Sequence, residues 1–368
     1  MLIIILYFFI VVVVVQLMYY VGVFGKFAFA KAQKITPKRI PISVIVCAKN
    51  EAENVIRYIP ILAEQEYPDF EIILIDDASC DGTLEIFEEF EKKYPNVKLV
   101  KVENNEAFWG SKKYALTLGI KAAKKDYLLF TDADCYPTTK DWIMTMSSQF
   151  TLHKTIVLGY GAYEKIAGSF LNKMIRFETM LTAVQYFSWA KKGHPYMGIG
   201  RNLAYKKEEF YTVKGFISHM KIRSGDDDLF INQVAKGKNT TVCFAPESFT
   251  YSQPKTTFKS WFIQKRRHVS TANHYKLFDK TQLAIFYVSQ LLFLLLSIFL
   301  LAFQFQWILV LSIIIFRYLF VWITIGFSAG KLKEKDVMYW FPIIEIVLIF
   351  TQLSIFLTNI FSKPVYWK

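Results

Sequence analysis

Long apolar runs lie toward both ends of the 368-residue chain, and shorter apolar runs alternate with polar segments between them. A helix needs roughly 20 predominantly apolar residues to cross a bilayer core. Arg317 and Glu345 interrupt two of the late runs, so we expect both side chains to face other helices or water. The pattern predicts one N-terminal and about three C-terminal transmembrane helices, at residues 2–24, 282–303, 307–327 and 339–361.

Lysine and arginine residues beside these runs indicate an orientation. They are Lys26, Lys31, Lys34, Lys38 and Arg39 after the first run, and Lys331, Lys333 and Lys335 between the last two. Such residues concentrate on the cytosolic side of membrane proteins, so both groups fit an N-terminus outside. The first run is too long for a signal peptide and follows no positive charge. We therefore expect a transmembrane anchor in residues 1–25, a cytosolic domain in 26–281 and membrane helices in 282–368, all in the cytoplasmic membrane.

Between the anchor and the late helices, short apolar runs alternate with segments typical of helices. Strands are predicted at residues 42–47, 70–75, 98–102, 128–131 and 156–160. Alternation of strands and helices over residues 42–150 predicts an α/β fold with a mainly parallel sheet.

Carboxylates directly follow two of these strands. Asp76 and Asp77 come after the second strand, and Asp132 and Asp134 end the fourth. Ligands of open α/β sheets bind off the carboxyl ends of the strands. Carboxylates there could hold a divalent cation against a phosphate, or accept hydrogen bonds from a nucleoside. The alternative for Asp134 is a turn before Pro137.

Other polar residues stand where helices are predicted to begin. Asn50 and Glu53 form a capping-box pattern, which leaves Glu51 free to point toward the sheet edge. Asp81 or Thr83 can cap the helix predicted at residues 84–94.

Two lysines stand in the first turn of a further helix, after the possible N-cap Ser111. Cations at this position work against the helix dipole, so a bound anion explains at least one of Lys112 and Lys113. A solvent-exposed face explains Lys113 equally well.

Three consecutive carboxylates, Asp226, Asp227 and Asp228, repel one another and therefore suggest a purpose. One can cap the helix predicted at residues 229–235, and one of the other two is a candidate general base. The glycine-containing stretch 198–202 suits either close approach of the backbone to a ligand or a turn.

Two helices in the second half combine apolar and polar faces. The helix predicted at residues 168–190 fits either core packing or contact with the membrane face. In the helix predicted at residues 258–275, Gln264, Arg267 and His268 share a face, and the remaining basic residues fit contact with lipid headgroups.

The formal net charge of +13 favours an anionic membrane surface or an anionic substrate. We do not expect nucleic acid as a partner, because no basic segment interleaved with aromatic residues is evident. The sequence has neither a GxGxxG fingerprint nor a P-loop. Its four cysteines lack metal-finger spacing and are typical of a reduced cytosolic domain.

Taken in order, these motifs resemble those of the family-2 glycosyltransferases, which have the GT-A fold. The similarity is greatest to the membrane-anchored branch of ceramide glucosyltransferase-like and cellulose or hyaluronan synthase-like enzymes. Three positions depart from the family pattern: Ser111 replaces a glycine, Asp226 a glutamate, and His268 the tryptophan of a Q-x-x-R-W motif. The matching series is Cys47-Ala48-Lys49-Asn50-Glu51, Asp76 to Thr83, Lys112, Asp132-Ala133-Asp134, Asp226-Asp227 and Gln264-Lys265-Arg266-Arg267.

The resemblance implies a membrane-bound inverting glycosyltransferase that uses Mg²⁺ or Mn²⁺, a nucleotide-sugar donor of the UDP-sugar type, and a lipid or lipid-linked glycan acceptor. The implied roles are catalytic base for Asp227, metal ligands for Asp134 and Asp132, nucleoside contact for Asp77, lining of the donor pocket for Glu51 and Lys112, and contact with the diphosphate and acceptor for Gln264 and Arg267. A processive polysaccharide synthase is the nearest alternative. A non-catalytic nucleotide-sugar-binding transport or sensor protein is the alternative from another class.

Overall fold

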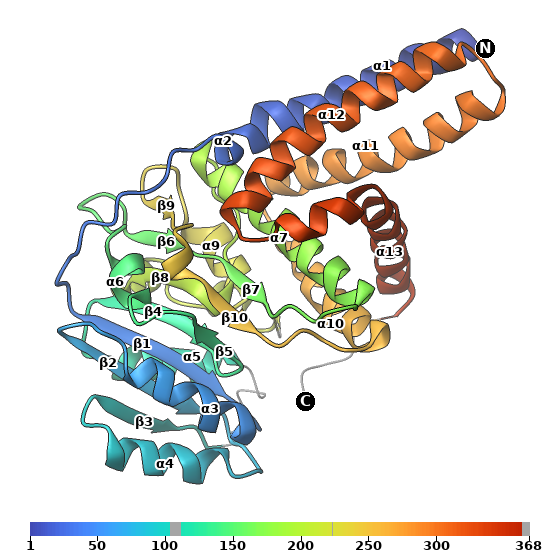
Figure 1. Cartoon of the computed structure of the whole chain (residues 1–368). Helices are drawn as coiled ribbons and strands as arrows, with labels where there is room; N and C mark the ends of the chain where they lie inside the picture. Colours follow the sequence, from blue (N-terminus) through green and yellow to red (C-terminus); the bar gives the residue numbers. More distant parts are fainter. Residues whose placement is uncertain (104–111, 223, 363–368) are drawn as a thin grey trace. The chain divides into compact units, whose positions relative to one another are not determined.

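The computed structural model describes residues 1–103, 112–222 and 224–362 (Figure 1). Contacts between residues divide the chain into two compact units. The helical unit contains Met1–Lys31, Gly168–Lys192 and the described residues 257–362. The α/β unit contains Ala32–Ala167 and Gly193–Thr256.

A seven-stranded sheet forms the centre of the α/β unit. Its order is β3 (Val97–Lys101), β2 (Phe70–Asp76), β1 (Ile42–Ala48), β4 (Tyr127–Asp132), β8 (Leu203–Lys206), β6 (Ile156–Leu158) and β9 (Thr240–Val242). The strand β8 runs antiparallel to both of its neighbours, whereas the other pairs are parallel. The predicted α/β fold with a mainly parallel sheet is therefore confirmed.

Helices and a small second sheet surround this sheet. The helices are α3 (Ala52–Ala63), α4 (Thr83–Lys93), α5 (Lys112–Ala122), α6 (Trp142–Ser147), α8 (Lys207–Thr212) and α9 (Asp228–Val234), with short turns η3 (Gly200–Asn202), η4 (Ile217–His219) and η5 (Pro246–Ser248). The small sheet has the order β5 (Cys135–Pro137), β10 (Thr250–Ser252) and β7 (Gly161–Tyr163). Because β5 begins directly after Asp134, pairing with β10 fixes the backbone beyond the predicted metal ligands.

The two faces of the sheet bury alternate residues of β1 and β2. Val46 and Leu74 belong to a core cluster that also contains side chains of α3, α4 and α6. Ile73 and Ile75 lie toward α5, which packs on β1 and β2. Burial on both faces explains why these strands are continuous apolar runs in the sequence.

The helix α5 approaches β2 most closely at Gly119. A Cβ atom at this position would lie 2.1 Å from Cδ1 and 2.7 Å from Cγ1 of Ile75. We expect Gly119→Ala to lower the free energy of unfolding by about 1–3 kcal/mol, because Ile75 or α5 must move. Denaturant unfolding measures this change. A gain in stability, as alanine gives in an open helix, would contradict the close packing.

Four helices of the helical unit are long and apolar enough to cross a membrane. The first runs through α1 (Leu2–Leu17), the π-helical η1 (Met18–Phe24) and α2 (Gly25–Ala28). The others are α11 (Leu277–Ala302), α12 (Trp307–Lys331) and α13 (Phe341–Phe361), which follows η7 (Lys335–Trp340). The first helix packs beside α11 and α12 (Figure 1). The predicted set of one N-terminal and three C-terminal apolar helices is confirmed.

This unit also contains α7 (Phe170–Lys191), α10 (Phe258–Thr271) and η6 (Ala272–His274). Most residues of α7 are buried, which favours core packing for this helix. On α10, Lys265 forms an ion pair with Glu178, and Nε of Arg266 donates to Oδ1 of Asn359 at 2.9 Å. Protein groups therefore contact both side chains, and the contact with lipid headgroups expected for them stays a prediction.

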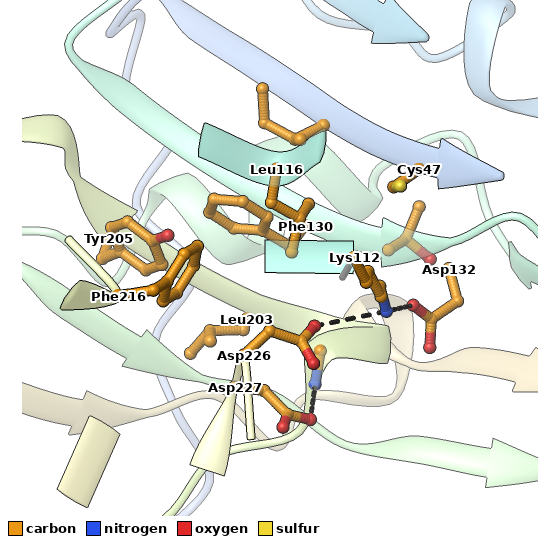
Figure 2. A pocket seen from close by; sticks show the side chains of 13 residues that line it. Cys47, Lys112, Leu116, Phe130, Asp132, Leu203, Tyr205, Phe216, Asp226 and Asp227 are labelled. Carbon is orange, nitrogen blue, oxygen red and sulfur yellow. Dashed lines mark hydrogen bonds and ion pairs between the residues drawn. The ribbon is translucent and has the colours of Figure 1, made fainter. Parts of the chain in front are cut away.

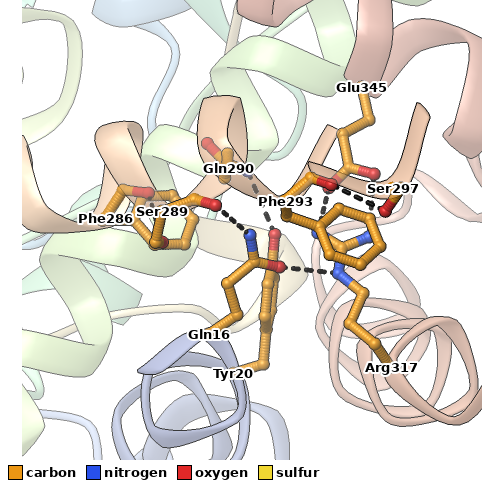
Figure 3. A network of polar contacts seen from close by, with 9 residues as sticks. All are labelled: Gln16, Tyr20, Phe286, Ser289, Gln290, Phe293, Ser297, Arg317 and Glu345. Carbon is orange, nitrogen blue, oxygen red and sulfur yellow. Dashed lines mark hydrogen bonds and ion pairs between the residues drawn. The ribbon is translucent and has the colours of Figure 1, made fainter. Parts of the chain in front are cut away.

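A buried polar network joins the four long helices (Figure 3). The guanidinium of Arg317 on α12 forms a two-pronged ion pair with Glu345 on α13, in which Nη1 lies 2.9 Å from Oε2. Its Nε donates to Oε1 of Gln16 on α1 at 2.7 Å, and the amide of Gln16 donates to the carbonyl of Ser289 on α11 at 2.7 Å. Arg317 is fully buried. The expectation that both charges face other helices is confirmed.

Candidate active site

The carboxyl ends of β1, β2 and β4 meet at one edge of the sheet. The strand register pairs Asp76 with Ala48 and Asp132 with Cys47. Parallel neighbours bring the residues that follow them around one depression. The pocket at this edge is lined by Cys47, Lys112, Asp132, Gly200, Asp226, Asp227 and apolar side chains that include Leu116, Phe130 and Tyr205 (Figure 2). Three predicted site residues, from three separate stretches of the sequence, thus share one pocket.

The loops after β1 and β2 are tied together by hydrogen bonds. Asn50 has a φ of 55° and accepts from the N–H of Cys80 at 2.8 Å, and the N-cap of α3 is Glu51. The predicted capping box is therefore wrong, because a contact with the second loop takes the Asn50 side chain. The N-cap of α4 is Gly82, without a side-chain cap, so neither Asp81 nor Thr83 is the cap; Asp81 instead bonds backbone N–H groups of both loops. Its Oδ1 accepts from the N–H of Thr83 at 3.0 Å, while Oδ2 accepts from Ala52 at the start of α3.

Glu51 and Asp77, the predicted donor-pocket residues, lie on these two loops. The carboxylate of Glu51 accepts from Nδ2 of Asn54 at 2.6 Å, and burial raises its pKa. Asp77 is buried, which raises its pKa, while Lys49 opposes the rise. Beside it, Oδ1 of buried Asp76 has no hydrogen-bond partner among the described residues. A buried carboxylate oxygen of this kind can accept a hydrogen bond from a ligand.

Lys112 is the charged centre of the pocket. Its Nζ lies 2.6 Å from Oδ1 of Asp132 and 3.3 Å from Oδ2 of Asp226 (Figure 2). Burial alone would lower the pKa of Lys112, but the two carboxylates outweigh it and hold the pKa well above its ordinary value. The side chain is 24% exposed, so an anionic ligand can reach the ammonium. The possible N-cap Ser111 lies outside the described residues.

Asp132, Asp134 and Cys135 form a group that could hold a cation. One possible ligand atom from each lies within 4.8 Å of the others. Loss of hydration and then repulsion from Asp132 raise the pKa of Asp134. A divalent cation relieves repulsion between carboxylates, and hard oxygen ligands suit Mg²⁺ or Mn²⁺. The residues present therefore fit such an ion, with Asp132 and Asp134 as oxygen donors.

The three residues of the acidic run have different partners. Asp226 pairs with Lys112, whereas Asp227 is the N-cap of α9. Its Oδ1 accepts from the N–H of Asp228 at 2.7 Å, and its Oδ2 accepts from the N–H of Gly200 at 2.6 Å. Burial first, and then the neighbouring Asp226 and Asp228, raise the pKa of Asp227 to about 7. From the sequence we expected the helix N-cap and the general base to be different carboxylates. In the structure, Asp227 is both the N-cap of α9 and the candidate base.

Arg201 also acts on the candidate metal site, although the sequence did not predict it as a site residue. Its guanidinium lies 4.4 Å from the ring centre of Tyr163, and Nη1 donates to Oγ of Ser252 at 2.9 Å. Its charge lowers the pKa of Asp134 and so opposes the rise at the candidate metal site. Its position could have indicated this role, because Arg201 directly follows Gly200 in the stretch 198–202, where we expected the backbone to approach a ligand closely. The close approach there is to the side chain of Asp227.

Gln264 and Arg267 lie on α10 of the helical unit, one turn apart and partly exposed. This spacing gives them the common face that the sequence predicted. Their roles beside a donor diphosphate stay predictions.

Two protein families have sequence profiles that match this chain. The profile of Glycosyl transferase family 2 matches residues 43–228, and that of Glycosyl transferase family group 2 matches residues 138–350. The first match includes all three stretches that contribute charged groups to the pocket.

Curated relatives match shorter segments. The chain is 40% identical over 93 residues to poly-beta-1,6-N-acetyl-D-glucosamine synthase from Staphylococcus epidermidis. The matched segment covers 25% of this chain and 21% of that protein. It is 26% identical over 240 residues to probable glycosyltransferase YdaM from Bacillus subtilis. This longer match covers 62% of this chain and 55% of that protein. The chain therefore spans less than two thirds of the length of either relative.

Among solved structures, the chain is similar to a mannosyltransferase from Pyrobaculum calidifontis in complex with GDP-Man and Mn²⁺. The TM-score is 0.55 at 16% sequence identity, and the alignment covers 88% of this chain and 98% of that one. At this identity the similarity establishes a shared fold.

Proposed function

This chain belongs to the family-2 glycosyltransferases and has their GT-A fold, and from this premise we propose that it is a membrane-bound inverting enzyme. It would transfer a sugar from a nucleoside-diphosphate donor, in particular a UDP-sugar, to a hydroxyl group of a lipid or lipid-linked glycan. The observation that carries the proposal is the position of the Lys112 ammonium between Asp132 and Asp226. An anionic diphosphate can become the partner of this cation in place of a carboxylate.

The proposed chemistry follows from the charges around the pocket. Asp227 takes the proton from the acceptor hydroxyl as the oxygen attacks the anomeric carbon. Attack on the face opposite the leaving group inverts the configuration at that carbon. Lys112 stabilises the negative charge that develops on the leaving nucleoside diphosphate, and Arg267 is proposed to assist it. Gln264 is proposed to contact the same diphosphate or the acceptor.

The remaining site residues hold the donor. Asp77 and Glu51 are proposed to contact the nucleoside. Oδ1 of Asp76, which has no partner in the described part of the chain, offers a further acceptor. Asp132 and Asp134 would hold Mg²⁺ or Mn²⁺ through their carboxylate oxygens. A bound ion of this kind neutralises charge on the leaving group.

The membrane setting is also a proposal. Four apolar helices support multi-pass insertion into the cytoplasmic membrane. The lysine and arginine groups favour residues 1–25 as an anchor, 26–281 on the cytosolic side and 282–368 as membrane helices. A catalytic unit held at a membrane suits an acceptor with a lipid portion.

Release of nucleoside diphosphate by detergent-purified protein tests the proposal. UDP- and GDP-sugars are compared in Mn²⁺ and in EDTA, with a membrane lipid extract as acceptor. We expect release that needs the metal and falls on the order of 10²-fold or more in Asp134→Ala, because the ion loses an oxygen ligand. Asp69→Ala is the matched control, since this carboxylate pairs with Lys125 at the surface. No release from any donor, or equal release in EDTA, contradicts the proposal.

A processive polysaccharide synthase is the second candidate, favoured by the match to the Staphylococcus epidermidis synthase. The histidine at position 268, where that branch carries tryptophan, argues against it. Product length separates the two, because a processive enzyme yields polymer and a single transfer yields one added sugar. The transport or sensor alternative rested on Arg317 and Glu345, which pair with each other.

A further inference from the structure

Lys113 follows Lys112 directly, yet it has a different environment. Its side chain is 1% exposed, so the solvent-exposed face considered for it is wrong. Its Nζ donates to the backbone carbonyls of His219, Ile222 and Ser224, each at 2.8 Å. An ammonium group has three donors, and here each of them has a carbonyl acceptor.

These carbonyls belong to the end of η4 and to the segment that follows it, which leads into the acidic run. Ser224 stands two residues before Asp226. Gly225 between them has a φ of 90°, and a Cβ there would lie 2.5 Å from Cδ1 of Leu229. The chain therefore makes a tight turn, which favours glycine, directly after the last carbonyl that Lys113 holds.

We propose that Lys113 is a positioning residue, which anchors this segment to α5 so that Asp226 and Asp227 keep their places beside Lys112. The two adjacent lysines act on the acidic run in different ways. Lys113 holds the backbone that enters the run, and Lys112 pairs with the side chain of Asp226. The catalytic consequence rests on the proposed function, whereas the anchoring does not.

The charge state of Lys113 gives this role a pH dependence. Burial lowers the pKa of Lys113 to about 8, while Asp226, Asp228 and Asp227 oppose the shift. Among the described residues of the anchored segment, the other titratable side chains are His219 and Lys221, and Lys112 is the neighbouring cation on α5. Loss of the proton leaves two N–H donors for three carbonyls. Activity should therefore decline as the pH rises above about 8.

Lys113→Met tests the proposal, because it keeps the length of the side chain and removes its donors. We expect faster hydrogen exchange in residues 216–222 and 224–229 without a general loss of protection. We also expect kcat to fall on the order of 10²-fold with little change in the donor KM, since small displacements of catalytic groups have effects of that size. The decline above pH 8 should be absent from the variant.

Lys154→Met is the matched control, because Nζ of Lys154 donates to the carbonyls of Gly237 at 2.6 Å and Thr240 at 3.0 Å in the same unit. It should speed exchange in residues 236–240 and leave kcat unchanged. If Lys113→Met does not fold, Lys113→Arg keeps a cation that cannot lose its proton near pH 8. That variant should retain part of the activity and lack the alkaline decline.

Unchanged exchange and unchanged kcat in Lys113→Met would overturn the proposal. So would a loss of kcat that merely follows thermal stability to the same extent in both lysine variants. If wild-type protein releases no nucleoside diphosphate from any donor, the proposed function fails. The exchange measurements still decide whether Lys113 anchors the segment.

Discussion

Asp227→Asn is expected to lower kcat by about 10²–10⁴-fold, because an amide cannot accept the proton of the acceptor hydroxyl. Donor binding should change little, since Lys112 pairs with Asp226 and Asp132 rather than with Asp227. Single-turnover transfer and separate binding of the nucleoside diphosphate measure the two effects. Asp226→Asn is the comparison variant, and it should weaken the hold on Lys112 and raise the donor KM. A larger loss of kcat in Asp226→Asn than in Asp227→Asn would identify Asp226, rather than Asp227, as the catalytic base.

The pH dependence of the wild type follows from the same carboxylate. The pKa of Asp227 is raised to about 7, so the base is largely protonated at pH 5 and free above pH 8. Activity should therefore rise with pH through about 7, and Asp227→Asn should lack this rise. The effect on stability has the opposite sign. A carboxyl with a raised pKa binds its proton more tightly in the folded state, so its contribution to stability falls as the pH rises from about 4 to 7.

Glu345→Ala is expected to destabilise the helical unit by about 3–5 kcal/mol, because it leaves the charge of buried Arg317 without its carboxylate. The hydrogen bond to Gln16 on α1 remains, but an amide carries no opposite charge. Thermal unfolding in detergent measures the loss.

The double variant Arg317→Met/Glu345→Met is the matched control for this prediction. Removal of both charges leaves no unpaired ion, so its stability should be close to that of the wild type. Equal melting temperatures for Glu345→Ala and the wild type would show that water or lipid headgroups reach Arg317.

The apolar pattern predicted the elements that position the site. Residues 42–47 were predicted as a strand and β1 is Ile42–Ala48, because a strand buried on both faces leaves a continuous apolar run. The carboxylates after β2 and β4 gather at one edge because parallel strands end there together. Short strands such as β8 escaped prediction, since a run of four residues does not show its direction or its neighbours.

Contacts between distant residues could not be predicted in the same way. Asn50 fits a local capping box, but its side chain binds the N–H of Cys80, 30 positions later. Lys113 fits an exposed helix face until three carbonyls more than 100 positions away are brought to it. In both cases the local sequence pattern is compatible with one environment for the side chain. The fold brings a distant segment to it instead, and no local pattern indicates that segment.

The order of the Arg317 network along the chain has a consequence for synthesis at a membrane. Gln16 precedes Arg317 by 301 positions, whereas Glu345 follows it by 28. When α12 is synthesised, Gln16, the amide partner of Arg317, has therefore already been translated, whereas its carboxylate partner Glu345 has not. An arginine in the middle of a helix costs about 2.5–3.5 kcal/mol on insertion scales. In the membrane insertion that we propose, integration of α12 would thus be favoured by an early helix and completed by a late one, and the helical unit would reach its final pairing only after α13 has been made.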